Sequence, residues 1–171
     1  MASGTSISRV TAKRTLVAGL GNILLGDEGA GVRAVEELQK RRDLPQYVSL
    51  VDGGTAGYAL IDLMKGYDRL IIIDAVRGGG PPGSIYRLLA DDIQQRPELR
   101  LSGHQIALPE VLLLAARLGE LPETLLLGIE PQEMEYGLHL SDKVNNAVQD
   151  VIRMVFEEVE HSPPPARAEG A

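Results

Sequence analysis

The sequence predicts an α/β fold: a single three-layer domain with a twisted, mostly parallel sheet of about five strands and helices on both faces. Short apolar runs typical of buried strands alternate with stretches in which apolar residues recur every three or four positions. The 171 residues can fill one hydrophobic core but are too few for two ordinary domains. We therefore expect the domain over residues 15–161, flanked by a flexible N-terminal extension (1–14) and a flexible C-terminal tail (162–171).

The first half of the chain predicts three strands separated by two helices. Arg69–Ile73 is the apolar run richest in β-branched residues and is therefore the expected central strand. The helix after the first strand places Val32, Val35 and Leu38 on one face. In order, the expected elements are a strand over 15–20, a helix over 28–42, a strand over 47–51, a short helix over 56–64 and a strand over 69–73.

The second half continues this alternation. The run Gly78–Gly83 predicts a turn, and Ser141 is the expected N-cap of a long C-terminal helix. Between them we expect a strand over 84–89, a helix over 108–118 and a last strand over 125–129. Residues at helical spacing are predicted to face the core: Leu108, Val111, Leu112, Ala115 and Leu118 in the first helix, and Val144, Val148, Val151, Ile152, Val155, Phe156 and Val159 in the second.

Composition excludes several kinds of chemistry. The chain has no cysteine, so a metal can be held only by Asp, Glu or one of three histidines, and disulfides and iron–sulfur ligation are excluded. The net charge is −7; residues 1–14 carry +3 and residues 162–171 are neutral, so the part between them carries −10. Such a domain is a poor binder of nucleic acid or of an anionic membrane. No membrane-spanning run or secretory signal is visible, and we expect a cytoplasmic protein.

The glycine-rich segment after the first strand matches a dinucleotide-binding loop only in part. Gly19 and Gly21 suit such a fingerprint, but its third glycine position falls on Leu24. Asp27 and Glu28 would also place two negative charges where a pyrophosphate needs bare N–H groups. A structural role is open for both acids, as an N-cap and a first-turn acid that stabilise the following helix.

Residues directly after the strands are the candidate site residues, because ligands of such sheets bind outside the carboxyl ends of the strands. Glu28, Asp74 and His104 all fall on this edge. Two carboxylates and one imidazole can form a three-ligand metal site with open positions. Structural turn formation stays open for Asp74, and Asp52 after the second strand either forms a turn or binds a ligand.

Four segments of the chain carry a family resemblance. They are GLGNILLGDEGAGVRAVEEL at 19–38, DGGTAG at 52–57, LIIIDA at 70–75 and SGHQ at 102–105. Together they resemble the NiFe-hydrogenase maturation endopeptidases, over a stretch from Thr15 through Ser141. The resemblance implies a single-domain α/β protease that removes the C-terminal extension of a hydrogenase large-subunit precursor after nickel has been inserted.

The resemblance also implies roles for individual residues. Glu28 and Asp74 match the two metal-contacting acids of the family and His104 matches its histidine, so these three residues are the expected catalytic and metal-recognising set. Gly103 departs from the pattern, because relatives often carry a less flexible residue there. The segment matched to substrate recognition consists of Asp52, Gly53, Gly54 and Thr55.

The chemistry of these donors is compatible with nickel. Nickel(II) accepts imidazole and carboxylate, and the sequence offers no cysteine that would favour zinc or copper(I). Three protein donors suit an enzyme that recognises nickel already ligated by its substrate, so the free protein need not hold a tightly bound metal. We hypothesise an aspartic-type or metal-assisted mechanism in which one carboxylate activates water on the scissile carbonyl. In the alternative, nickel only positions the peptide.

Three other functions stay open at this stage. A hydrolase of the same fold with its own metal would purify with a stoichiometric ion. A non-catalytic nucleotide binder, based on the Gly19 and Gly21 turn and on Asp52, would bind dinucleotides. A chaperone for the hydrogenase subunit would sense nickel without cutting, and only a cleavage assay separates it from the protease.

Overall fold

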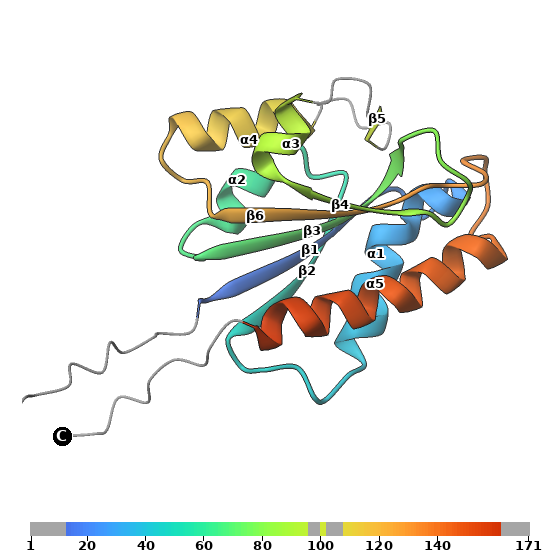
Figure 1. Ribbon diagram of the computed structural model, residues 1–171, viewed down its shortest axis with the longest axis horizontal. Coiled ribbons are helices and arrows are strands. Elements are labelled where there is room, and N and C mark those ends of the chain that lie inside the picture. The colour runs from blue at the N-terminus through green and yellow to red at the C-terminus, as the bar shows by residue number, and fades with distance from the viewer. Residues whose placement is uncertain (1–12, 96–99, 102–107, 162–171) are drawn as a thin grey trace, which may run out of the picture.

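A twisted sheet with helices on both faces forms the domain in the computed structural model, which describes residues 13–95, 100–101 and 108–161 (Figure 1). The strand order is β2-β1-β3-β6-β4, and all neighbours are parallel except β4, which is antiparallel to β6. The short strand β5 pairs antiparallel with the end of β3. The bounds are β1 Thr15–Leu20, β2 Val48–Gly54, β3 Arg69–Arg77, β4 Ile85–Leu89, β5 Arg100–Leu101 and β6 Glu123–Ile129. The predicted fold class is confirmed.

The helices divide between the two faces of the sheet. One face is covered by α1 (Ala30–Gln39) and α5 (Asp142–Glu160), and the other by α2 (Ala59–Met64), α3 (Ala90–Gln95) and α4 (Leu108–Arg117) (Figure 1). A one-turn 3-10 helix, η1 (Gly26–Gly29), joins the loop after β1 to α1. None of the helices in the described ranges is long and apolar enough to cross a membrane.

The core is split by the sheet into two layers, as the alternation along β3 illustrates. Ile71 and Ile73 pack toward α1 and α5, whereas Leu70 and Ile72 pack toward α2 and α4. All four are fully buried, as expected for a central parallel strand. The predicted inward residues of the helices are buried too, except Leu118, which lies beyond the end of α4 and is exposed, and Phe156, which is partly buried against the core.

Some helices and strands begin or end at residues other than those predicted from the sequence, and the structure gives the reason for each difference. The helix predicted over 28–42 begins as η1 and ends at Gln39, because Lys40 caps it and the chain turns. The central strand predicted over 69–73 runs on to Arg77, since β5 pairs with its last residues. The short elements α3 and β5 were not predicted. The α3 sequence ADDIQQ contributes only Ile93 to the described core, and the two residues of β5 are too few to show a pattern.

The C-terminal helix begins where the sequence predicts, but its capping differs. Ser141 is the N-cap of α5, yet its side chain makes no cap hydrogen bond. Its hydroxyl instead donates to Asp27 Oδ2 at 2.9 Å. Of the segments predicted to be flexible, residues 1–12 and 162–171 lie outside the described residues. At the end of the N-terminal segment, Arg14 donates its backbone N–H to Asp68 Oδ2 at 2.8 Å.

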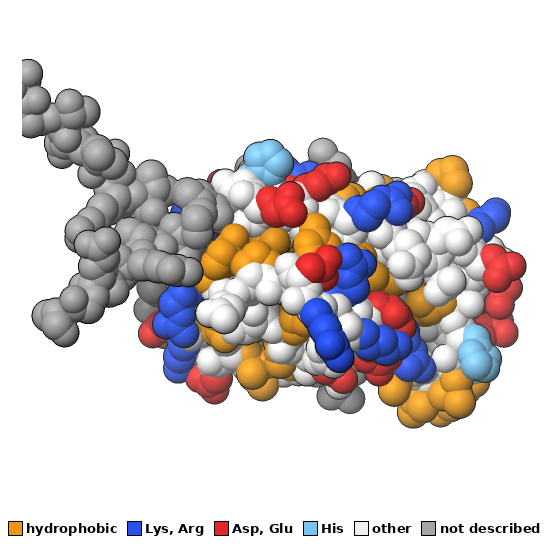
Figure 2. Space-filling model, turned by 90° about the horizontal axis from the view of Figure 1, so that it is seen from below, with side chains coloured by type: hydrophobic (Ala, Val, Ile, Leu, Met, Phe, Trp, Pro, Cys, Tyr) orange, Lys and Arg blue, Asp and Glu red, His pale blue; other side chains and the backbone are white. Residues whose placement is uncertain are grey.

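Charges of both signs alternate on the face that carries α5. Figure 2 shows acidic and basic side chains interspersed there, with hydrophobic side chains between them. The basic run at the end of α1 is neutralised locally, because Lys40 pairs with Glu37 at 2.6 Å and Arg41 with Asp43 at 2.8 Å. Such exposed pairs contribute little to stability.

Candidate functional site

The carboxyl ends of the parallel strands meet at one edge of the sheet, toward the right of Figure 1. The first turn of α1 is seated directly on this edge because of glycines. A Cβ on Gly31 would overlap the carbonyl oxygens of Leu20 and Ile73, the ends of the paired parts of β1 and β3. Gly21 has φ +132°, and a Cβ there would overlap the carbonyl of Glu28. The glycine pattern therefore serves close packing of a helix start on two strands.

Glu28 is held at this edge by that packing. It lies in η1, which contacts β3, and it precedes Gly31 by three residues, on the same side of the helical turn. The residue is buried, with 4% of its surface exposed. No hydrogen bond from the described residues reaches its carboxylate. A carboxylate at this edge that no donor of the described fold engages is a candidate for contact with a ligand.

Asp74 lies in β3, one residue beyond the last pair that β3 forms with β1. It is fully buried and is paired in register with Gly128 of β6. Its Oδ1 accepts a hydrogen bond from the backbone N–H of Ala75 at 2.8 Å. By the alternation of the strand, its side chain is on the face of Leu70 and Ile72, the face that α4 covers.

The third predicted ligand, His104, lies outside the described residues, in the segment before α4. Within the ranges that the structure describes, no group of three or more His, Cys, Asp or Glu side chains is arranged to hold a metal ion. The described part of the expected set is the pair Glu28 and Asp74, from η1 and the central strand.

Asp27 has a role that sequence reasoning missed. Its carboxylate accepts four hydrogen bonds: from the N–H groups of Gln132, Glu133 and Ser141 at 2.8, 3.0 and 2.7 Å, and from the Ser141 hydroxyl. The structural role left open for Asp27, as the N-cap of the following helix, is wrong, because Leu25 is at the N-cap of η1 and no side chain caps it. Asp27 instead joins η1 to the loop after β6 and to the start of α5.

Four acidic residues are buried in the described part of the chain, and all four are at this edge: Asp27, Glu28, Asp74 and Glu130. Glu130, directly after β6, accepts hydrogen bonds from the Tyr86 hydroxyl at 2.6 Å and from the N–H of Gly78 at 2.7 Å. Burial, followed by the bond to Glu130, raises the pKa of Tyr86. Concentrated buried acids make this edge favourable for a cation.

The end of β2 and the next residue, Thr55, form one wall of a cleft of ≈ 380 Å³. The strand predicted over 47–51 runs on to Gly54, because Asp52 and Gly54 still pair with β1. Asp52 is exposed there, and its Oδ1 accepts a hydrogen bond from the N–H of Gly54 at 2.9 Å, which is the turn-forming role. The carbonyl of Gly54 in turn accepts the N–H of Gly21 at 2.9 Å, so the end of β2 is fastened to the segment after β1. The cleft is lined by Gly21, Asn22, Ile23, Leu24, Val32, Asp52, Gly54 and Thr55.

Comparisons with known proteins agree with this architecture. A family model described as hydrogenase maturation protease (HycI) matches residues 32–158. The chain is 38% identical over 151 residues to the hydrogenase 2 maturation protease of Escherichia coli, covering 87% of this chain and 92% of that one. It is 41% identical to the hydrogenase expression/formation protein HupD of Thiocapsa roseopersicina, over 83% of this chain and 66% of the relative's length.

Solved structures give the same result. The fold is similar to that of the hydrogenase maturating endopeptidase HybD from E. coli, with TM-score 0.79, 36% identity, and coverage of 92% of this chain and 99% of the other. It is also similar to the maturation protease HybD from Thermococcus kodakarensis, with TM-score 0.73, 28% identity, and coverage of 85% and 99%. With the match of the family model over most of the domain, this shows that the chain belongs to the hydrogenase maturation protease family.

Proposed function

We propose that this protein is an endopeptidase that removes the C-terminal extension of a NiFe-hydrogenase large-subunit precursor in the cytoplasm, after nickel has been inserted. Glu28, Asp74 and His104 recognise the nickel, which the substrate brings with its own ligands. The segment of Asp52, Gly53, Gly54 and Thr55, at the end of β2, contacts the peptide. The observation that carries this proposal is the burial of Glu28 and Asp74 at one edge of the sheet, in a chain of the maturation protease family.

The distribution of charge supports recognition of a cation. Asp27 and Glu130 are engaged by backbone N–H groups and hydroxyls, so their negative charges are fixed in place. They add to the negative potential around Glu28 and Asp74. A carboxylate pair with an imidazole is a donor set that nickel(II) accepts, and an ion that arrives with substrate ligands needs only a few donors from the enzyme.

Hydrolysis of the peptide requires a water molecule, a base and stabilisation of the oxygen that becomes negative. One of the two carboxylates takes a proton from the water molecule while the oxygen of that water bonds to the scissile carbonyl carbon. Breakage of the C–N bond then releases the extension, whose new amino group takes up a proton. Nickel positions the precursor so that only a nickel-loaded subunit places its scissile bond at this edge.

Processing of a large-subunit precursor tests the proposal. The purified protein is incubated with the precursor, with and without nickel, and intact mass measures loss of the extension. We expect cleavage only of the nickel-loaded precursor. Glu28→Gln, Asp74→Asn and His104→Ala each abolish it, whereas Glu37→Gln, the same change at an exposed position of α1, does not.

Three results would contradict parts of this proposal. Cleavage that does not depend on nickel overturns nickel recognition but leaves the protease. Binding of the precursor without any loss of mass supports a docking chaperone in its place. Normal processing by one of the three variants removes that residue from the proposed set.

A further inference from the structure

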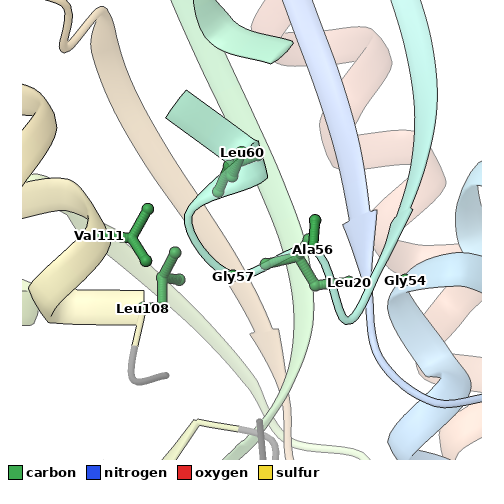
Figure 3. A pocket seen from close by; sticks show the side chains of 7 residues that line it. All are labelled: Leu20, Gly54, Ala56, Gly57, Leu60, Leu108 and Val111. Atoms are coloured by element: carbon green, nitrogen blue, oxygen red, sulfur yellow. The ribbon is translucent and has the colours of Figure 1, made fainter. Parts of the chain in front are cut away.

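A small apolar pocket lies beside the edge that carries Glu28 and Asp74. Figure 3 shows Leu108 and Val111 pointing from α4 toward Leu60 of α2, with Leu20 and Ala56 on the opposite side. Gly54 and Gly57 complete the lining, so no polar side chain contributes to it. The volume is ≈ 10 Å³, about the room for one water-sized group.

The position of this pocket connects it to the candidate site. Leu20 is the last residue of β1, next to the glycines on which α1 is seated. Gly54 lines both the pocket and the ≈ 380 Å³ cleft, so both hollows border the segment matched to substrate recognition. The pocket is also on the α2 and α4 face of the sheet, the face of the Asp74 side chain.

An apolar group suits this pocket better than water does. A water molecule needs two to four polar partners to be held, and no lining side chain provides one. A methyl group fills the same volume and gains dispersion contacts with the surrounding leucine and valine side chains. A peptide in the adjoining cleft brings such groups within reach as its own side chains.

We propose that this pocket binds one apolar side chain of the peptide substrate, next to the scissile bond, and selects for small size. This inference rests on the proposed protease function and adds to it a determinant of cleavage-site choice. One methyl group of an alanine or valine side chain fits into the pocket, whereas the ring of phenylalanine is too large to enter it. Ala56 and Val111 are the lining residues chosen for the test, because a larger side chain at Ala56 fills the pocket and a smaller one at Val111 enlarges it.

The test uses nickel-loaded precursor variants with Gly, Ala, Val, Leu or Phe at each of the two positions flanking the scissile bond. At one position, we expect the unaltered protein to cleave the Ala and Val substrates about tenfold or more faster than the Phe substrate. Ala56→Leu fills the pocket and reduces cleavage of the Val substrate about tenfold relative to Gly. Val111→Ala enlarges the pocket and raises the rate of cleavage of the Leu substrate, relative to that of the Val substrate, by a similar factor.

Matched controls carry the same substitutions away from the pocket. Ala59→Leu changes an exposed residue of α2, and Val148→Ala removes the same atoms from a buried position of α5 on the other face of the sheet. Both should leave the order of substrates unchanged. If Ala56→Leu fails to fold, as its melting curve would reveal, Val111→Ala decides the question by its opposite effect.

The outcomes separate the two proposals. If the unaltered protein cleaves the precursor but shows no size preference, or if neither pocket variant shifts the preference, the pocket inference is overturned and the protease stands. If no precursor is cleaved at all, the proposed function fails and the pocket inference fails with it.

Discussion

Asp27 and Glu28 are adjacent in the sequence and equally buried, yet their surroundings are opposite. Four hydrogen bonds hold the Asp27 carboxylate between η1, the loop after β6 and the start of α5. The Glu28 carboxylate receives none from the described residues and lies at the end of the central strands. The fold saturates the carboxylate of Asp27, and the described part of the fold gives the carboxylate of Glu28 no hydrogen bond.

This difference gives a physical criterion for separating structural acids from chemical ones. Keeping a carboxylate buried costs several kcal/mol unless donors compensate it, so a saturated acid stabilises the fold. Glu130 and Glu158 belong with Asp27: the first is bonded to Tyr86 and Gly78, and the second to Arg69 and Arg87. Substitutions at bonded acids should change stability, and substitution at Glu28 should change activity.

Glu28→Gln should produce the largest effect. Loss of a general base or metal-contacting group lowers cleavage of the nickel-loaded precursor by about 10²–10⁴-fold, equivalent to about 3–5 kcal/mol of activation free energy. The melting temperature should stay the same or rise, because no hydrogen bond of the fold is lost and a buried charge is removed. Intact mass and a melting curve measured on the same sample check both statements. A large fall in melting temperature would move Glu28 into the structural class.

Asp27→Asn should have the opposite profile. The amide loses the negative charge and presents N–H groups to donors that need an acceptor, so the free energy of unfolding falls by about 3 kcal/mol. For a domain of this size the melting temperature falls by about 6–12 °C. Asp62→Asn, an exposed acid of α2, is the matched control and should melt normally. Activity per folded molecule should persist below the melting transition; loss of activity in a stably folded variant would give Asp27 a chemical role.

Much of the fold could be predicted from local pattern. The apolar runs of β1 and β3 and the periodic faces of α1, α4 and α5 record which side of each element meets the core. The short α3 and β5 could not be predicted, because Ile93 is the one core residue that α3 adds in the described chain and β5 has only two residues. The antiparallel direction of β4 is likewise set by its pairing with β6 rather than by its own residues.

The site was predicted in part for a related reason. Glu28 and Asp74 could be assigned to one edge, because each comes at or after the end of a strand and parallel strands share an edge. The role of Asp27 could not, since its partners are 105 to 114 positions away along the chain. For the same reason, the sequence does not indicate that the Ser141 hydroxyl bonds to Asp27 instead of capping α5.

Glu158→Gln extends the comparison to the opposite end of the sheet, and we expect a loss of about 2 kcal/mol in the free energy of unfolding at pH 7. Burial raises the pKa of Glu158, but the hydrogen bonds and charges of Arg87 and Arg69 outweigh it, so the pKa lies below its usual 4.5. This contribution is therefore complete above pH 4.5 and is lost as the pH falls through the lowered pKa. Urea unfolding at pH 7 and pH 3 should show the variant approaching the unaltered protein at low pH. Glu157→Gln is the exposed control, and precursor cleavage should be unaffected in both.

Tyr86→Phe should give the smallest effect, about 1 kcal/mol, because Glu130 keeps the N–H of Gly78 as a donor. The N–H of Gly80, which donates to the Tyr86 hydroxyl at 3.0 Å, is partly exposed and can bond to water instead. The stabilisation that Tyr86 provides changes with pH in the direction opposite to that of Glu158. Burial, and then the bond to Glu130, raise the pKa of Tyr86 above 10.0, so the folded state holds this proton more tightly than the unfolded chain does. The stabilisation is complete below pH 10.0 and is lost as the pH rises through the raised pKa. Unfolding in urea between pH 8 and pH 11 should therefore be less pH-dependent in Tyr86→Phe, whereas Tyr136→Phe, at a hydroxyl that is almost fully exposed, should follow the unaltered protein. If the two variants behave alike, Glu130 is not held by Tyr86 in the way that Asp27 is held by Ser141, and the bonded class is reduced by one member.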